Sequence, residues 1–391
     1  MKIHSELFIV ISLLFLTSCT NNISMDRNIS DLNKRLDKYL ALQLQEDQFP
    51  GVQYIVFDNN KILYEYADGF AKIEANERMH PNSLLNVFST TKILTAISIL
   101  QLVEDKKLSL DDKIEKHLPD VPYKDITILD VLSHSSGIPN PFLGNFFIHW
   151  SNEHDDFDRD ALLITIMEEN KELKFKSGEK ILYSNLGYAI LGKIIENVSN
   201  LRYEDYVIKY IINRLKLDKQ EINFGDQTQS RAARPYFKRF SLIYNIMVML
   251  LKGNETKVEG KWKAIDKSFY FNFPSHGGIM ASSREYSKIF MDLLDDKSVL
   301  LSPESINTLF TLQRHYDDKS IAISWFKGEM QGKGLPYFYH QGGGMGYVAE
   351  VRIYPEMGIG SLILMNRTEV DTLSILNALD SEYILNMQTK N

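Results

Sequence analysis

Apolar residues recur with a helical period near both ends of the chain, and strand-like runs lie beside each of these helices. The segment "SDLNKRLDKYLALQLQE" at 30–46 places its leucines on one face, which predicts an amphipathic helix with Ser30 as its cap. Two β-rich runs, "GVQYIVFD" and "KILYEYA", follow around Asn59 and Asn60, and this arrangement predicts a hairpin. Three further strand-like runs, "LPYFYHQ", "YVAEVRIYP" and "GIGSLILMN", precede a final helix at 371–387.

The middle of the chain is mainly helical in pattern. Helices are predicted at 89–104, at 127–137 behind a capping box of Thr127 and Asp130, at 159–170, at 185–198 and at 203–215. We therefore expect an α+β fold, in the form of an α/β sandwich. Both chain ends contribute to one antiparallel sheet flanked by helices, and the middle, roughly 105–265, forms a mostly helical lobe.

The composition is that of a globular protein, because 44% of the 391 residues are hydrophobic and 24% are charged. The net charge of −7 gives no general attraction to nucleic acid, so no nucleic-acid partner is expected. The motifs described below require no cofactor, and none is expected.

Residues 1–18 have the features of a secretory signal peptide, since Lys2 precedes ten apolar residues and then "TSC". The stretch "LTSC" is similar to the bacterial lipoprotein box, in which the cysteine, here Cys19, is lipidated. The alternative is a cysteine that lies near a cleavage site by chance. We expect a polar tether at 19–29 and a catalytic body at 30–391. The protein would be exported and lipid-anchored to a bacterial membrane, facing the periplasm or the cell exterior.

The stretch "FSTTKIL" places Ser89 three residues before Lys92, and residues with this spacing share one face of a helix. A serine hydroxyl is a poor nucleophile until a base takes its proton, and a lysine among apolar neighbours favours the neutral form that can act as this base. The alternative is an ordinary helix cap followed by a surface lysine. The same spacing at Ser177 and Lys180 includes Gly178 and polar neighbours, which indicate a turn.

A second motif, "YSN", places Tyr183 and Asn185 immediately before a predicted helix. A tyrosine there can share protons with Ser89, and an asparagine can orient Lys92 and a substrate amide. The similar "YFN" at Tyr270 has no helix behind it.

A third motif, "HQGGG", ends a strand-like run and contains His340, Gly342 and Gly343. Glycines let a substrate backbone lie close along a strand edge. The backbone N–H of Gly343, together with that of Ser89, can form an oxyanion hole. The similar "HGG" at His276 lacks a strand before it.

The ordered set S-x-x-K, Y-x-N and H-x-G resembles the serine β-lactamase and penicillin-binding protein superfamily, specifically its class C-like branch. That branch also holds esterases, D-aminopeptidases and DD-peptidases. Flanking stretches such as "LLNVFSTTKILTA", "ITILDVLSHSSGIP" and "HGGIMASSREYSKIF" are similar as well, and the resemblance covers roughly 30–368. It implies a β-lactamase/transpeptidase-like fold and a serine hydrolase that forms an acyl-enzyme with a small ester, peptide or amide.

The resemblance also implies roles for the motif residues. Ser89 is the implied nucleophile and Lys92 its base. Tyr183 is the implied proton carrier to the leaving group, and Asn185 positions the substrate.

The resemblance places His340 and Gly342 on a substrate-binding strand, where His340 replaces the lysine of typical β-lactamases. A lysine is a permanent cation suited to the carboxylate of penicillins, whereas a histidine with a pKa of about 6.5 is largely neutral at pH 7. We therefore expect neutral esters or amides to be preferred to penicillins. If His340 meets the substrate, the preference for carboxylated substrates should fall between about pH 5.5 and 8. The alternative is that His340 only hydrogen-bonds Tyr183 or Ser89.

Three functions remain open at this point. The first is a serine hydrolase of esters, D-amino-acid peptides or related amides, and the second is a β-lactamase or DD-peptidase. The third is a catalytically weak envelope-binding protein on the same fold. The intact Ser89, Lys92, Tyr183 and Asn185 favour an enzyme, because binding alone does not require this set.

Three other segments carry no predicted chemistry. The segment "HWSNEHDD" at 149–156 has no usual zinc spacing and is interpreted as a solvated loop, so no metal is expected. His134 is expected to stabilise a turn. The apolar "SLIYNIMVMLLK" at 241–252 is too short to span a membrane, and a buried helix, a pocket wall or membrane-surface contact are its possible roles.

Overall fold

The computed structural model describes residues 25, 26, 28, 30–141, 146–151, 154–225, 231–241, 256–265, 268–330 and 334–388. The predicted signal peptide, Cys19 and most of the tether lie outside the described residues, as does the apolar segment beyond Ser241. Among the helices within these ranges, none has the length and apolar character that crossing a membrane requires.

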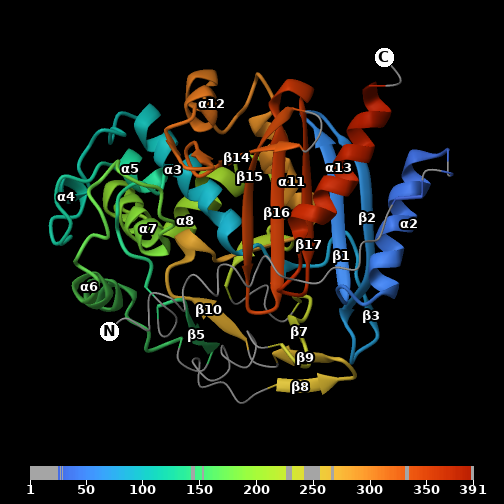
Figure 1. Cartoon of the computed structure of the whole chain (residues 1–391). Coiled ribbons are helices and arrows are strands. Elements are labelled where there is room, and N and C mark those ends of the chain that lie inside the picture. Colours follow the sequence, from blue (N-terminus) through green and yellow to red (C-terminus); the bar gives the residue numbers. More distant parts are fainter. Residues whose placement is uncertain are drawn as a thin grey trace.

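A nine-stranded antiparallel sheet forms the centre of the fold, and its strands lie in the order β12-β13-β14-β15-β16-β17-β1-β2-β3 (Figure 1). These strands are β1 (Gly51–Asp58), β2 (Ile62–Lys72), β3 (Glu77–Arg78), β12 (Arg314–Tyr316), β13 (Lys319–Ile321), β14 (Phe326–Met330), β15 (Leu335–Gly344), β16 (Tyr347–Tyr354) and β17 (Ile359–Met365). The C-terminal β17 pairs directly with the N-terminal β1, so the predicted sheet from both chain ends is confirmed.

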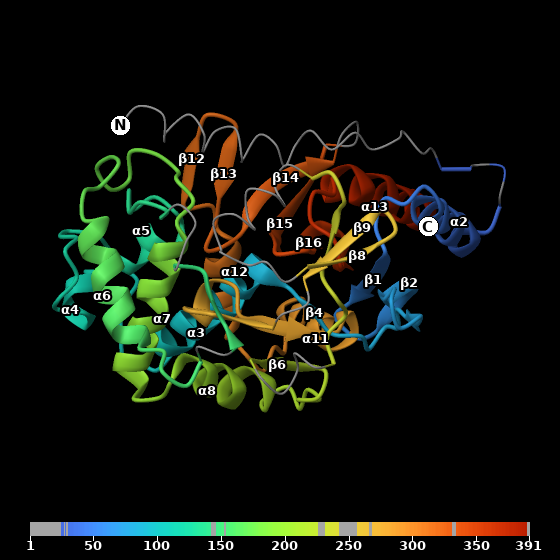
Figure 2. The same cartoon turned by 90° about the horizontal axis from the view of Figure 1, so that it is seen from below.

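Helices cover the sheet and fill the middle of the chain. The α-helices are α2 (Leu32–Gln45), α3 (Lys92–Glu104), α4 (Ile114–His117), α5 (Ile128–Leu132), α6 (Arg159–Glu169), α7 (Asn185–Ser199), α8 (Tyr203–Val207), α11 (Ser283–Leu293), α12 (Pro303–Phe310) and α13 (Thr372–Gln388). Three 3₁₀ helices, η1 (Phe88–Thr91), η4 (Pro274–His276) and η5 (Pro355–Met357), and a π-helical turn, η3 (Ile208–Ile212), complete the set. Figure 2 shows α4, α6 and α7 at the side of the molecule opposite α2 and α13.

Strand β1 has apolar side chains on both faces, because successive side chains of a strand point to opposite sides and helices cover both. Tyr54 and Val56 belong to the core beneath α2 and α13. Ile55 and Phe57 belong to the larger core on the other face, where α11 packs against β1 and β17. The sheet therefore separates two apolar cores, one on each of its faces.

Short strands form three small sheets beside the main one. They are β4 (Leu85–Asn86), β11 (Ile279–Ala281) and β6 (Ile222–Phe224), then β5 (Ile148–Trp150) and β10 (Phe269–Phe271), and finally β7 (Tyr236–Lys238), β9 (Trp262–Ile265) and β8 (Thr256–Glu259). The described residues between Ile222 and Ile265 thus form short strands where a mostly helical lobe was predicted.

Some local predictions differ from the structure. Asp31 caps α2 in place of Ser30, because its carboxylate accepts the backbone N–H of Lys34. The predicted helix at 203–215 becomes π-helical after α8. The predicted capping box is confirmed, since Thr127 and Asp130 bond each other's backbone N–H groups.

The segment "HWSNEHDD" was expected to be a solvated loop, and this prediction holds only for its later residues, since Ser151 and residues 154–156 are exposed. Its first residues form β5, which pairs with β10, and His149 is buried there. Nδ1 of His149 lies 2.7 Å from Oδ1 of Asn272, and its Nε2 lies 2.9 Å from Nδ1 of His154. No cluster of histidine, cysteine, aspartate and glutamate within the described ranges is suited to a metal ion.

Candidate active site

Ser89 lies in η1, where the chain turns from β4 into α3. The preceding Phe88 has a φ angle of 47°, a conformation that bulky residues seldom adopt. Its backbone N–H donates to Oδ1 of Asn86 at 2.7 Å, and its ring meets Phe271 edge-on. Backbone strain that surrounding contacts hold in place is typical of functional sites. The Ser89 side chain itself is only half-buried.

Lys92 is fully buried, and its Nζ has three polar neighbours. Oγ of Ser89 lies 3.1 Å away, Oδ1 of Asn185 2.7 Å, and the carbonyl oxygen of His276 2.7 Å. Lys92 forms no ion pair with any carboxylate in the described part of the chain. Burial without a counter-charge lowers the pKa of Lys92 well below its usual 10.5.

An ammonium could donate to all three of these oxygen atoms, but burial without a counter-charge favours the neutral amine, whose bonding capacity they also match. Oδ1 of Asn185 and the carbonyl of His276 can only accept hydrogen bonds, so they take the two N–H groups of an uncharged Lys92. The remaining lone pair then faces the Ser89 hydroxyl, which can donate to it. The arrangement therefore suits a lysine that removes a proton from Ser89.

Tyr183 lies beside this lysine, with Nζ of Lys92 4.9 Å from the centre of its ring. Its hydroxyl is buried and has no hydrogen-bond partner within the described ranges. Burial raises the pKa of Tyr183 well above its usual 10, and the neighbouring Ser89 hydroxyl offsets part of this shift. Tyr183 is thus a protonated phenol at neutral pH, which suits a proton donor.

The N-terminus of α7 fixes the position of Asn185. The preceding Ser184 caps the helix by accepting the backbone N–H of Gly187 at 3.0 Å, and it donates to the carbonyl of Pro139 at 3.1 Å. The backbone N–H of Asn185 donates to Oδ1 of Asn140 at 2.9 Å. These bonds connect the helix to the neighbouring loop, so the Asn185 side chain points reliably at Lys92.

Strand β15 adjoins the turn that carries Ser89, and Gly342 is the point of contact. A Cβ atom on Gly342 would lie 2.2 Å from the carbonyl oxygen of Val87 and 2.8 Å from the backbone nitrogen of Ser89. Only glycine permits this approach. A Cβ on Gly343 would make only ordinary contacts, and this residue is exposed. The oxyanion hole of Ser89 and Gly343 stays a prediction.

His340 on β15 is buried, and its tautomer follows from its neighbour. Nδ1 lies 2.8 Å from the carbonyl oxygen of Gln341, which can only accept, so Nδ1 carries a proton. Nε2 of the neutral ring is then an acceptor, and it has no partner within the described ranges. Burial, together with the nearby Lys92, lowers the pKa of His340 to about 3. The expected titration between about pH 5.5 and 8 is therefore wrong, because His340 is neutral throughout that range.

Sequence reasoning missed the part that His276 plays. The "HGG" motif at His276 was rejected as a candidate for the substrate-binding strand. The backbone carbonyl of His276 is nevertheless one of the three contacts of Lys92. A carbonyl is common to every residue, so no side-chain pattern signals this role. Ser177, the first residue of the rejected S-x-x-K match, lies in a turn as predicted.

Comparison with known proteins agrees with this geometry. A family model described as Beta-lactamase matches residues 25–380 of the chain. The chain belongs to the Beta-lactamase family. The resemblance stated from the motifs is thereby confirmed.

Individual relatives of this Beta-lactamase family member are distant. A penicillin-binding protein of Bacillus subtilis (strain 168) is 32% identical over 163 residues, which cover 42% of this chain and 36% of that protein. The chain therefore aligns with little more than a third of that relative's length.

Two solved structures share the fold. A penicillin-binding protein homologue from Pyrococcus abyssi has a TM-score of 0.71 at 22% identity, over 90% of this chain and 77% of its own. The D-amino acid amidase of Ochrobactrum anthropi SV3, complexed with D-phenylalanine, has a TM-score of 0.77 at 17% identity, over 91% and 100%. The predicted β-lactamase/transpeptidase-like fold is confirmed.

Proposed function

We propose that the protein is an exported serine hydrolase that cleaves small amides or esters, D-amino-acid peptides included, through an acyl-enzyme on Ser89. One observation carries this proposal. Nζ of the fully buried Lys92 lies 3.1 Å from Oγ of Ser89, and its two other contacts accept both N–H groups of a neutral amine. A binding protein has no need of a base held in this way.

The proposed reaction begins when neutral Lys92 takes the Ser89 proton and Oγ attacks the substrate carbonyl carbon. The carbonyl oxygen gains the negative charge, which the backbone N–H groups of Ser89 and Gly343 stabilise. As the tetrahedral intermediate collapses, the bond to the leaving group breaks and Tyr183 donates its proton to it. The Lys92 ammonium then returns a proton to Tyr183. A water molecule hydrolyses the ester on Ser89 by the same steps in reverse.

The state of His340 favours substrates without a carboxylate at its position. A neutral ring whose free nitrogen is an acceptor attracts a donor such as an amide N–H or an ammonium group, and it offers no charge to a carboxylate. A D-amino acid amidase complexed with D-phenylalanine has the same fold, which supports amides of D-amino acids as a substrate class. The β-lactamase or DD-peptidase alternative rests on the similarity to penicillin-binding proteins.

Membrane anchoring is a separate part of the proposal, and it rests on "LTSC" behind a short apolar run. We expect Cys19→Ser to release the protein from the membrane fraction of expressing bacteria. Equal retention of this variant would contradict lipidation at Cys19.

The catalytic proposal is tested by labelling the purified protein with a fluorophosphonate and, separately, with a fluorescent penicillin. Mass spectrometry of the digest should place the fluorophosphonate on Ser89. Ser89→Ala should abolish labelling and lower turnover of a D-phenylalanine anilide by on the order of 10⁶-fold. The control Ser177→Ala has the same S-x-x-K spacing in a turn and should match wild type. A label on another residue, or full activity of Ser89→Ala, would exclude the proposal.

A further inference from the structure

His134 holds the segment that carries Tyr183 at three points. Its backbone carbonyl accepts the backbone N–H of Leu182 at 2.8 Å. Its side-chain Nδ1 lies 3.2 Å from the backbone nitrogen of Ser184. Its ring packs on the Tyr183 ring, with 4.4 Å between the two centres. The residues immediately before and after Tyr183 are thus bound by the same histidine.

These contacts also determine the protonation of His134. The backbone N–H of Ser184 can only donate, so Nδ1 must present a lone pair and the proton of the neutral ring lies on Nε2. Burial first of all, with Lys92 and His340 nearby, lowers the pKa of His134 well below its usual 6.5, so the ring is neutral. The backbone of His134 has a φ angle of 52°, which directs both its carbonyl and its ring toward the 182–184 segment.

Tyr183 depends on this support because its own polar group provides none. The phenol hydroxyl has no partner at hydrogen-bonding geometry in the described part of the chain, and the Ser89 hydroxyl, which lowers its pKa, turns freely and does not hold the ring in place. The ring has His134 at 4.4 Å and Nζ of Lys92 at 4.9 Å, and His340 meets it edge-on at 6.4 Å. Among these neighbours, His134 alone also binds the adjoining backbone.

We propose that His134 is a positioning residue that sets the place of the Tyr183 hydroxyl for proton delivery. This inference rests on the proposed function, in which Tyr183 protonates the leaving group. It goes beyond stabilising a turn, because a purely structural histidine would affect folding and leave the reaction of correctly folded molecules unchanged. Misplacing a catalytic group by about 1 Å costs on the order of 100-fold in rate, so an effect on kcat is expected.

Two variants separate positioning from stability. His134→Ala removes the ring and the Nδ1 acceptor, and we expect kcat for a D-phenylalanine anilide to fall on the order of 10- to 100-fold with little change in KM. His134→Asn keeps an acceptor oxygen and tolerates the positive φ angle. It should recover the backbone contact to Ser184 and part of the lost kcat. Equal kcat in wild type and a folded His134→Ala would overturn the inference.

A double-mutant cycle identifies the residue through which His134 acts. In a Tyr183→Phe background the hydroxyl is gone, so adding His134→Ala should change kcat by less than about twofold. If the two effects on kcat multiply, His134 acts elsewhere and the inference fails. Failure of the proposed function looks different, because it would leave wild type unlabelled at Ser89.

A measurement that needs no activity covers the case in which His134→Ala does not fold. NMR of the wild-type protein with ¹⁵N-labelled histidine reports which ring nitrogen carries the proton, and His134→Asn assigns the signal by its loss. We expect the proton on Nε2 of His134 and on Nδ1 of His340. A proton on Nδ1 of His134 would exclude its bond to Ser184 and overturn the inference.

Discussion

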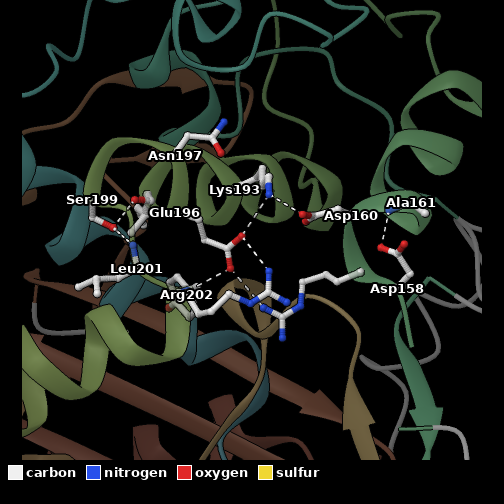
Figure 3. Close-up of polar contacts among 12 residues, drawn as sticks. Asp158, Asp160, Ala161, Lys193, Glu196, Asn197, Ser199, Leu201 and Arg202 are labelled. Atoms are coloured by element: carbon white, nitrogen blue, oxygen red, sulfur yellow. Dashed lines mark hydrogen bonds and ion pairs between the residues drawn. The ribbon is translucent and has the colours of Figure 1, made fainter. Parts of the chain in front are cut away.

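Lys92 contacts the first residue of α7 and Lys193 belongs to this helix, but the surroundings of the two lysines differ in the one respect that decides their chemistry. Lys92 is fully buried with only neutral oxygen atoms around its Nζ. Lys193 is partly exposed on the outer side of α7, where it lies 2.8 Å from Asp160 and 3.5 Å from Glu196 (Figure 3). Burial without a counter-charge favours a neutral base, whereas pairing with carboxylates keeps a cation in place as a structural contact.

The region around Lys193 connects three helices through Glu196. This carboxylate lies 3.4 Å from Arg159 of α6 and 3.6 Å from Arg202 before α8, and it accepts the backbone N–H of Tyr203 at 3.1 Å. Figure 3 shows Arg202 and Lys193 converging on it. Arg159, Lys193 and Glu196 line a small pocket together with Ser275 of η4. Ser275 directly precedes His276, whose carbonyl contacts Lys92. The charged cluster therefore supports the back of the site and contributes no reacting group.

Exchanging each lysine for arginine should separate the two regions most strongly. Arginine keeps the positive charge but cannot lose its proton at neutral pH, so Lys92→Arg removes the base. We expect its turnover of a D-phenylalanine anilide to fall by on the order of 10³- to 10⁴-fold. The matched control Lys193→Arg retains its ion pairs and should stay within about twofold of wild type. Similar losses in both variants would contradict the comparison.

Acid should lower the free energy of unfolding through the site rather than through the charged cluster at Glu196, because three buried histidines surround Lys92 and Tyr183. Burial lowers the pKa of His134, His276 and His340, the last to about 3. Below about pH 6.5 these histidines bind protons in the unfolded chain, whereas in the folded protein they stay neutral until the pH is much lower. The stabilising contribution is thus complete above about pH 6.5 and is lost as the pH falls, by about 1.4 kcal/mol per pH unit for each histidine.

Urea unfolding at a series of pH values measures this slope. His340→Gln should lower this slope by the contribution of one histidine, about 1.4 kcal/mol per pH unit. An unchanged slope in that variant would contradict a neutral, buried His340.

A lysine at position 340 should give the site a charge of the kind that the Lys193 region holds. We expect His340→Lys to raise the preference for a carboxylated over a neutral substrate, measured as a ratio of kcat/KM, about tenfold or more. In wild type that preference should be flat from about pH 5.5 to 8, because His340 does not titrate there. A wild-type preference that falls across this range would show that His340 titrates there and contradict its neutral state. Efficient penicillin hydrolysis with a flat preference would favour the β-lactamase alternative.

The smallest effect is expected at Glu196. Glu196→Gln removes the charge that three cations share but keeps an acceptor for the Tyr203 N–H, so the free energy of unfolding should fall by roughly 1–2 kcal/mol. Because the cluster contributes no reacting group, kcat should stay within about twofold of wild type. A large loss of kcat in the folded variant would show that the cluster does more than support η4.

The sequence predicted the side chains that meet in the candidate site better than the backbone groups that support them. Ser89 and Lys92 were found because a spacing of three on one helical face is visible in a single segment, although the turn at Ser89 is 3₁₀-helical. The sheet from both chain ends followed from short β-rich runs that turn residues separate. Two supporting contacts were not predicted, namely the His276 carbonyl with Lys92 and the Ser184 N–H with the His134 ring. Both use backbone groups that nearly every residue carries. Only the assembled fold shows which of these backbone groups meet the site.

The protonation state of Lys92 is the central claim, and NMR titration measures it directly. Lysines labelled with ¹³C beside Nζ change their chemical shift on losing a proton, and Lys92→Arg assigns the Lys92 signal by its absence. The structure predicts that Lys92 titrates well below its usual value of 10.5, because it is buried without a counter-charge. A Lys92 signal that titrates at or above 10.5 would mean a charged ammonium at working pH, and it would contradict the proposed activation of Ser89.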